Sequence, residues 1–116
     1  MQGTIFSGDK AATKIMEDYL DKFKDLFGKD FSPGTLNLEL EKKIDWSKWE
    51  FLKGFTKEGR NRGGVYYKEG RLETEEVIFL RPEMSKYTNN VIEAISEKNL
   101  RKALKLRDRD QVEVVI

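Results

Sequence analysis

The chain has 116 residues and a formal net charge of +1 at pH 7, a length that favours a single domain over residues 1–116. It contains no Cys and no His, which excludes disulfides, thiolate metal sites, imidazole bases and His-dependent catalytic triads. The near-neutral charge argues against a general nucleic-acid binder, and the lack of a bilayer-length apolar run or signal-peptide pattern predicts a cytoplasmic protein with no membrane partner.

The first third of the chain predicts one short strand and one long helix. The strand covers residues 3–7, and apolar residues then recur at helical spacing over residues 11–27. Gly28 follows the last of them and is typical of a helix stop with positive φ. Thr13 and Asp9 are both suitable N-caps, so the sequence leaves the first turn of the helix open.

Residues 32–40, Ser-Pro-Gly-Thr-Leu-Asn-Leu-Glu-Leu, are the most informative stretch. Pro-Gly predicts a tight turn, and the strictly alternating residues after it predict a strand. Thr35 and Asn37 fall on its polar face, two residues apart. Their neutral oxygens suit a hard cation whose other ligands are phosphates and water. On spacing alone we favour an ordinary polar strand face, and only the surrounding motifs support a metal site.

The remainder of the chain is predicted to be mainly β. A helical turn is expected at 45–49, a hairpin turn at Glu69-Gly70, a polar loop at 83–90 and a short helix at 99–104. Strands are expected over residues 51–55, 63–67, 71–80, 91–95 and 111–116. Together with the first strands, these elements predict a mainly β fold with one long helix, closed as an antiparallel barrel.

Six short motifs, spread over nearly the whole chain, are similar to those of one enzyme family. They are residues 3–8, Tyr19 with the Phe23-to-Gly28 spacing, residues 32–40, the Gly-Phe, Gly-Arg and Gly-Gly-Val pattern at 54–65, residues 91–101 and residues 106–112. In this order and spacing the chain resembles the archaeal CTP-dependent riboflavin kinases. The resemblance implies a six-stranded cradle-loop barrel that transfers the γ-phosphoryl group of CTP to the 5′-hydroxyl of riboflavin, giving FMN and CDP.

The resemblance also implies roles for individual residues. Thr35 and Asn37 would hold Mg²⁺, while Ser85 and Glu93 would bind riboflavin. Glu93, the nearest carboxylate, and Asn37 are the catalytic candidates. Arg101 would pair with phosphate. The nucleotide would be bordered by Lys98, Asn99, Leu100 and Arg101, and by the first loop, Gly8, Asp9, Lys10, Ala11, Ala12 and Thr13. Riboflavin and CTP are the expected partners, and a monomer is expected.

The first loop departs from the family pattern of alternating glycines, because only Gly8 remains. Alanine does not reach positive φ freely, so the loop must follow another path. One such path starts the helix earlier and offers its N-terminal amides, with Lys10 and Thr13, to the phosphates. Asp9 would repel those phosphates.

Ordinary structural roles compete with these assignments. Glu93 also suits a solvated strand position, Trp46 and Trp49 suit corner packing, and two basic patches, residues 53–62 and 98–109, suit either solvated faces or one nucleotide. The altered first loop motivates a second hypothesis from another class. In it, the chain is a related barrel that has lost catalysis and acts as a ligand-sensing or DNA-associated regulatory module.

Overall fold

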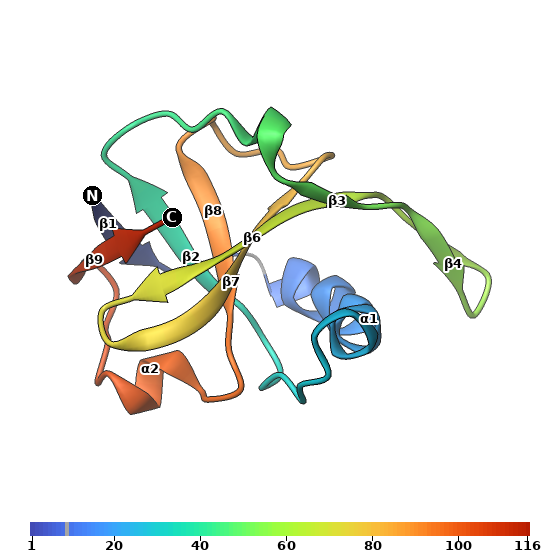
Figure 1. Ribbon diagram of the computed structural model, residues 1–116, viewed down its shortest axis with the longest axis horizontal. Coiled ribbons are helices and arrows are strands. Elements are labelled where there is room, and N and C mark those ends of the chain that lie inside the picture. Colours follow the sequence, from blue (N-terminus) through green and yellow to red (C-terminus); the bar gives the residue numbers. More distant parts are fainter. Residues whose placement is uncertain (9) are drawn as a thin grey trace.

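The centre of the molecule is a barrel of antiparallel strands (Figure 1). The computed structural model describes residues 1–8 and 10–116, with the backbone alone for residues 10–14. The barrel strands are β1 (Gln2–Phe6), β2 (Leu36–Leu40), β6 (Val65–Leu72), β7 (Glu75–Pro82), β8 (Val91–Ile95) and β9 (Gln111–Val115). They follow the order β6-β7-β8-β2-β1-β9, and pairing between β6 and β9 closes the circle. The predicted six-stranded, mainly β fold is confirmed.

Apolar residues at alternating positions of the strands fill the barrel interior. Leu36, Leu38 and Leu40 are all buried there, in one cluster with Ile5 and Phe79. Burying one such side chain stabilises the fold by about 1.5–3 kcal/mol. The other face of β2 is thereby turned outward, which leaves its polar residues on the outer surface of the barrel.

The long helix α1 (Lys10–Phe27) packs on the outside of the barrel. Its buried residues, Met16, Tyr19 and Phe23, meet a second apolar cluster that includes Ile78 and Ile95. The helix begins at Lys10, so the earlier of the two predicted starts is confirmed, while the proposed cap Asp9 lies outside the described residues. The predicted stop at Gly28 is also confirmed, because its φ is +66°.

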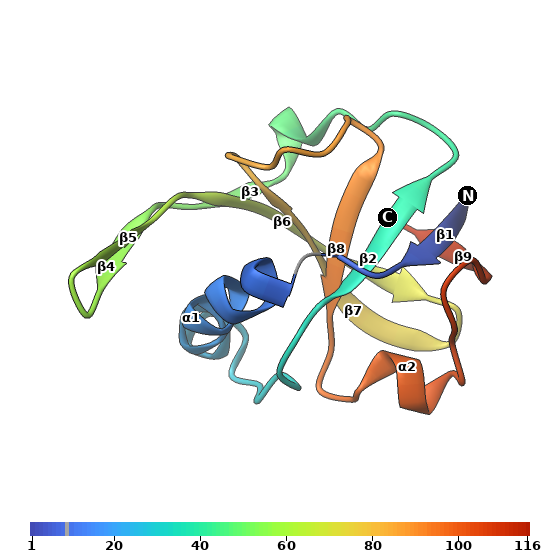
Figure 2. The same cartoon turned by 180° about the vertical axis from the view of Figure 1, so that it is seen from behind.

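Two hairpins differ from the prediction. The expected strand at 51–55 is divided into β3 (Glu50–Leu52), which pairs with β6, and β4 (Phe55–Lys57), which pairs with β5 (Arg60–Arg62). β4 and β5 form an arm that extends from the barrel beside α1 (Figures 1 and 2). Its turn is Glu58-Gly59, and both residues have positive φ, as a tight two-residue hairpin requires.

The predicted turn at Glu69-Gly70 is wrong. β6 continues through Gly70 to Leu72, and the turn begins at Glu73, whose φ is +52°. A Cβ at Gly70 would lie 2.4 Å from the carbonyl oxygen of Val115 and 2.5 Å from the ring of Phe79. Gly70 therefore permits a close approach of β9 within the closed barrel.

The two short helical segments lie close to their predicted places. η1 (Trp46–Lys48) is capped by Asp45, and α2 (Leu100–Ala103) by Asn99. Trp49 belongs to the barrel core, which confirms its packing role. In the part of the chain that the structure describes, no helix is long and apolar enough to cross a membrane.

Candidate functional site

Thr35 and Glu93 meet on the outer face of the barrel, where β2 pairs with β8. The hydroxyl of Thr35 donates a hydrogen bond of 2.7 Å to Oε1 of Glu93. Asn37 lies directly opposite Glu93 in the strand register. The structure therefore brings the two candidate metal ligands and one candidate flavin ligand together, although 58 residues separate Thr35 from Glu93.

The surroundings of Glu93 favour its neutral form. Burial raises the pKa of this carboxyl, while the hydrogen bond from Thr35 and the positive charge of Arg81 act in the opposite direction. A carboxyl with a raised pKa is better suited to taking a proton near neutral pH than an ordinary surface glutamate.

The first loop reaches this cluster at Gly8. A Cβ on Gly8 would lie 2.5 Å from Nδ2 of Asn37, so a larger residue would require the loop or that amide to shift. The next residues, Lys10, Ala11, Ala12 and Thr13, form the first turn of α1. The backbone N–H groups of a first turn have no partner within their own helix. Asp9, also a candidate in this loop, lies outside the described residues.

A small cavity of about 110 Å³ adjoins Thr35. It lies between the Pro33-Gly34 turn and the segment that leads from β8 into α2. The candidate nucleotide residues that line it are Lys98, Asn99, Leu100 and Arg101. The structure therefore places these four residues and one candidate metal ligand around the same hollow.

Three of the cavity residues also have structural partners. Asn99 caps α2, since its Oδ1 accepts a hydrogen bond from the backbone N–H of Lys102. Leu100 is buried in the barrel core. Lys98 forms an ion pair of 3.3 Å with Glu75, although both side chains remain partly accessible.

Arg101 ties α2 to the beginning of the first loop. Its Nη2 donates to Oδ1 of Asp108 at 2.8 Å and lies 3.5 Å from the hydroxyl of Ser7. That hydroxyl in turn donates to Oδ2 of Asp108 at 2.7 Å. These contacts lower the pKa of Asp108. Neither Ser7 nor Asp108 was expected at the site, although each lies inside one of the six motifs.

Ser85 lies in the 83–90 segment, and no hydrogen bond in the described part of the chain joins it to Glu93. Its hydroxyl accepts from the backbone N–H of Tyr87 at 3.2 Å. The ring of Tyr87 packs edge-on against Phe6, with centroids 5.5 Å apart, and Phe6 lies opposite Asn37 in the sheet. The segment is thus connected to the site through Tyr87.

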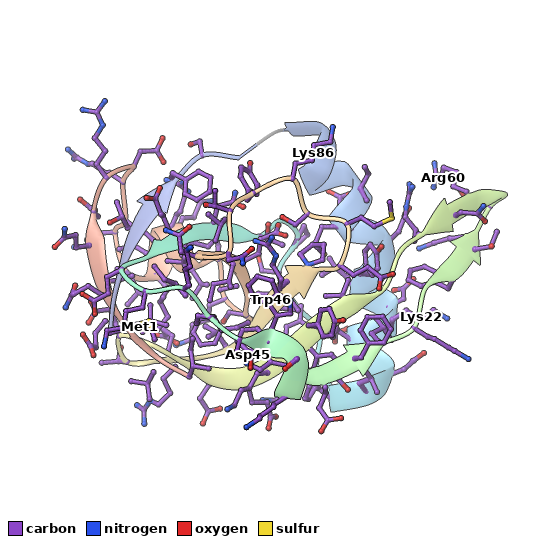
Figure 3. The ribbon with its side chains drawn as sticks, turned by 90° about the horizontal axis from the view of Figure 1, so that it is seen from above. Met1, Lys22, Asp45, Trp46, Arg60 and Lys86 are labelled. Carbon is purple, nitrogen blue, oxygen red and sulfur yellow. The ribbon has the colours of Figure 1, made fainter. Side chains whose placement is uncertain are left out.

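The base of the 83–90 segment is held by Arg81, a residue for which the sequence predicted no role. Its guanidinium is buried and stacks on Trp46, 4.5 Å from the ring centroid. Trp46 lies in η1, which runs beside this segment (Figures 1 and 3). An arginine next to a proline gives no sequence signal that it will be buried.

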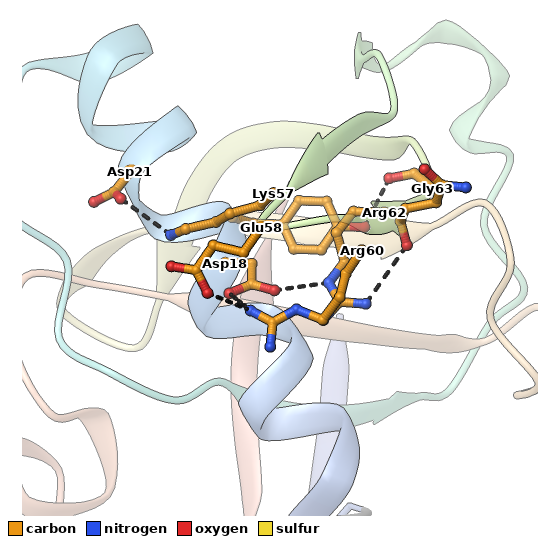
Figure 4. Close-up of polar contacts among 9 residues, drawn as sticks. Asp18, Asp21, Lys57, Glu58, Arg60, Arg62 and Gly63 are labelled. Carbon is orange, nitrogen blue, oxygen red and sulfur yellow. Dashed lines mark hydrogen bonds and ion pairs between the residues drawn. The ribbon is translucent and has the colours of Figure 1, made fainter.

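Lys57, Arg60 and Arg62 of the basic patch at 53–62 form ion pairs with Asp18 and Asp21 of α1 (Figure 4). Nε of Arg62 lies 2.8 Å from Oδ2 of Asp18, and Lys57 lies 3.3 Å from Asp21. The hydroxyl of Tyr19 donates to the carbonyl oxygen of Gly63 at 2.7 Å. This patch therefore fastens the arm to the helix, which argues against its use as a nucleotide site.

Comparison with known proteins decides the family. The family model of the CTP-dependent riboflavin kinase domain, described as "Domain of unknown function DUF120", matches residues 5–116. The chain belongs to the CTP-dependent riboflavin kinase family. The resemblance drawn from the six motifs is therefore confirmed.

Several archaeal relatives of this family carry the name riboflavin kinase, which denotes a phosphotransferase. The protein of Ignicoccus hospitalis is 35% identical over 125 residues, covering 100% of this chain and 70% of its own length. That of Staphylothermus marinus is 32% identical over 117 residues, covering 100% and 90%. That of Methanocella arvoryzae is 35% identical over 103 residues, covering 87% of this chain and 48% of its own length.

The donor set of the site fits Mg²⁺. Because Thr35 gives its proton to Glu93, the lone pairs of its oxygen remain available to a cation. Asn37 adds a neutral amide oxygen from the same face of β2. Few protein oxygens beside substrate phosphates are typical of Mg²⁺ in phosphoryl transfer.

Proposed function

We propose that this chain transfers the γ-phosphoryl group of CTP to the 5′-hydroxyl of riboflavin, giving FMN and CDP. The observation that carries the proposal is the hydrogen bond between Thr35 and Glu93, because it joins the candidate metal ligand to the candidate flavin ligand. Membership of the riboflavin kinase family supports the same reaction. The chain would act as a cytoplasmic monomer.

Thr35 and Asn37 would hold Mg²⁺ next to the phosphates of the nucleotide. The ion would neutralise negative charge on the β- and γ-phosphoryl groups. The role of the protein is to fix the two oxygens. The turn at Gly34, with φ of +88°, directs the chain into β2, and the buried leucines of β2 hold its polar face outward.

Glu93 would bind the ribityl chain of riboflavin and accept the proton of its 5′-hydroxyl. The hydroxyl oxygen forms a bond to the γ-phosphorus, while the bond from that phosphorus to the β–γ bridging oxygen breaks and CDP leaves with its electron pair. The proton passes to a carboxylate oxygen of Glu93. Its raised pKa suits that role. Ser85 would donate a further hydrogen bond to the flavin.

The nucleotide would occupy the surface between the first loop and α2. Lys98 and Arg101 contribute positive charge at the cavity beside Thr35. Gly8 and the first turn of α1, residues 10–13, would contribute backbone N–H groups to the phosphates. Asp108 already neutralises part of the charge of Arg101, so we assign Arg101 an orienting role as well as an attractive one.

A product assay tests this proposal. Purified protein is incubated with riboflavin, Mg²⁺ and one of CTP, ATP, GTP or UTP, and the flavins are separated by chromatography. We expect FMN, formed fastest with CTP. Absence of FMN with every nucleotide would reject the proposal, and tight, salt-sensitive DNA binding by the same protein would favour the regulatory alternative.

A further inference from the structure

Arg81 is the least exposed charged residue in the part of the chain that the structure describes. Only 5% of it is exposed. Its guanidinium donates to three carbonyl oxygens: Nη1 to those of Thr88 at 2.9 Å and Val91 at 2.7 Å, and Nη2 to that of Tyr87 at 2.8 Å. Removing a cation from water is costly unless such partners replace the lost hydration. These three bonds therefore fix the backbone of residues 87–91 around the guanidinium.

Further contacts stabilise the backbone of residues 87–91, the second half of the segment. Trp46 covers the guanidinium from η1. The backbone N–H of Ile44 donates to the carbonyl oxygen of Asn89 at 3.1 Å, and the side chain of Asn90 donates to that of Leu40 at 3.1 Å. Residues 87–91 are therefore fixed to the barrel by hydrogen bonds to Arg81, Ile44 and Leu40.

The first half of the segment is held more loosely. Glu83 exchanges hydrogen bonds with Gly64, but Met84 is 78% exposed and Lys86 is also exposed. Between the two halves, Ser85 and Tyr87 are linked by a hydrogen bond, and Tyr87 packs on Phe6. The position of Ser85 relative to the site therefore depends on where the backbone of Tyr87 is held.

We infer that Arg81 is a positioning residue for riboflavin: by holding the carbonyl groups of Tyr87 and Thr88, it places Ser85 and the ring of Tyr87 beside the end of β1. This inference rests on the proposed function. The nucleotide cavity adjoins the start of β2 and is lined by residues 32–36, 94–96 and 98–101, whereas the backbone that Arg81 holds lies near the end of β2, where Val91 pairs with Glu39. Loss of Arg81 should therefore weaken riboflavin binding and leave nucleotide binding nearly unchanged.

The test compares Arg81→Met, which removes all five donors, with Arg81→Lys, which keeps the charge but not the planar fork. Arg71→Met is the matched control, because Arg71 is exposed on β6. Phe23→Leu controls for a general loss of stability, because Phe23 of α1 is buried against the barrel. Two quantities are measured for each protein: the rate of tryptic cleavage after Lys86 in the native protein, and the KM values for riboflavin and CTP.

We expect Arg81→Met to raise the cleavage rate and the riboflavin KM by about tenfold each, with a change in the CTP KM below about twofold. Arg81→Lys should show a cleavage rate and a riboflavin KM between those of Arg81→Met and the wild type. Both controls should have the same ratio of the riboflavin KM to the CTP KM as the wild type. An unchanged cleavage rate, or equal changes in both KM values, would overturn the inference.

The cleavage assay requires no enzymatic activity, so failures of the two proposals can be distinguished. A wild-type protein that forms no FMN and quenches no riboflavin fluorescence would overturn the proposed function, and with it the flavin part of the inference. Normal FMN formation by Arg81→Met with wild-type KM values would overturn the inference alone.

Discussion

Thr35 and Glu93 form a 2.7 Å hydrogen bond across the β2–β8 pair, on the outer face of a barrel whose interior is filled by leucine, valine and phenylalanine. Two strands far apart in the sequence thereby place a hydroxyl, an amide and a carboxyl within one patch. The first loop passes directly over the amide at Gly8.

Asn37→Ala should lower kcat by at least about 100-fold, because it removes the amide oxygen that we propose as a ligand of Mg²⁺. Asn37 is on the outer face of β2 and only partly buried, so the melting temperature should change little. Asn61→Ala, in the arm, is the control and should retain full activity. Wild-type turnover in Asn37→Ala would show that the metal assignment is wrong.

Gly8→Ala should reduce kcat/KM strongly. The new Cβ would lie 2.5 Å from Nδ2 of Asn37, so either the loop or the amide must shift. The matched control is Gly59→Ala. Gly59 has φ of +77° and no atom within 4 Å of an added Cβ, so this change should cost about 1 kcal/mol of stability through backbone strain while preserving activity. Equal activity of the two variants would contradict the close approach at Gly8.

Glu93→Gln should become more stable relative to the wild type as the pH rises. The folded-state pKa of Glu93 is raised above its ordinary value of 4.5, so the folded protein binds this proton more tightly than the unfolded chain. Stability from this group is therefore full below pH 4.5 and is lost as the pH rises through the folded-state pKa. Urea denaturation of both proteins between pH 4 and pH 8 measures the difference. A difference that does not vary with pH would show that Glu93 is not buried as described.

Asp18→Asn and Arg62→Gln should each lower the melting temperature, because the 2.8 Å ion pair fastens the arm to α1. The double variant should lose less than the sum of the two single changes. Added salt should reduce the difference between wild type and variants. Strict additivity in this double-mutant cycle would show that the two side chains do not interact.

The sequence was sufficient to predict a strand or helix where one local pattern of apolar residues determines it. The alternation of Leu36, Leu38 and Leu40 predicted a strand with a polar outer face, and the helical spacing up to Phe27 predicted α1. Each pattern reflects burial of one face, which depends on nearest neighbours in the chain.

The sequence was not sufficient where contacts between residues far apart in the chain determine the local structure. Gly70 resembles a turn residue, but the close approach of β9 places it inside a strand. In the turn between β4 and β5 only Gly59 gave a usable signal, because positive φ favours glycine but not Glu58, and the strands on either side have only three residues each. Arg81 is buried because backbone carbonyl groups and the ring of Trp46 surround its guanidinium, and no local sequence pattern predicts these contacts.

The most direct measurement follows the phosphorus atom itself. The protein is incubated with riboflavin, Mg²⁺ and CTP labelled in its γ-phosphoryl group, and the label in the purified flavin product is counted for the wild type and for Asn37→Ala. We predict labelled FMN from the wild type and almost none from the variant. Label that stays out of the flavin with the wild type, or enters it equally with both proteins, would contradict the account.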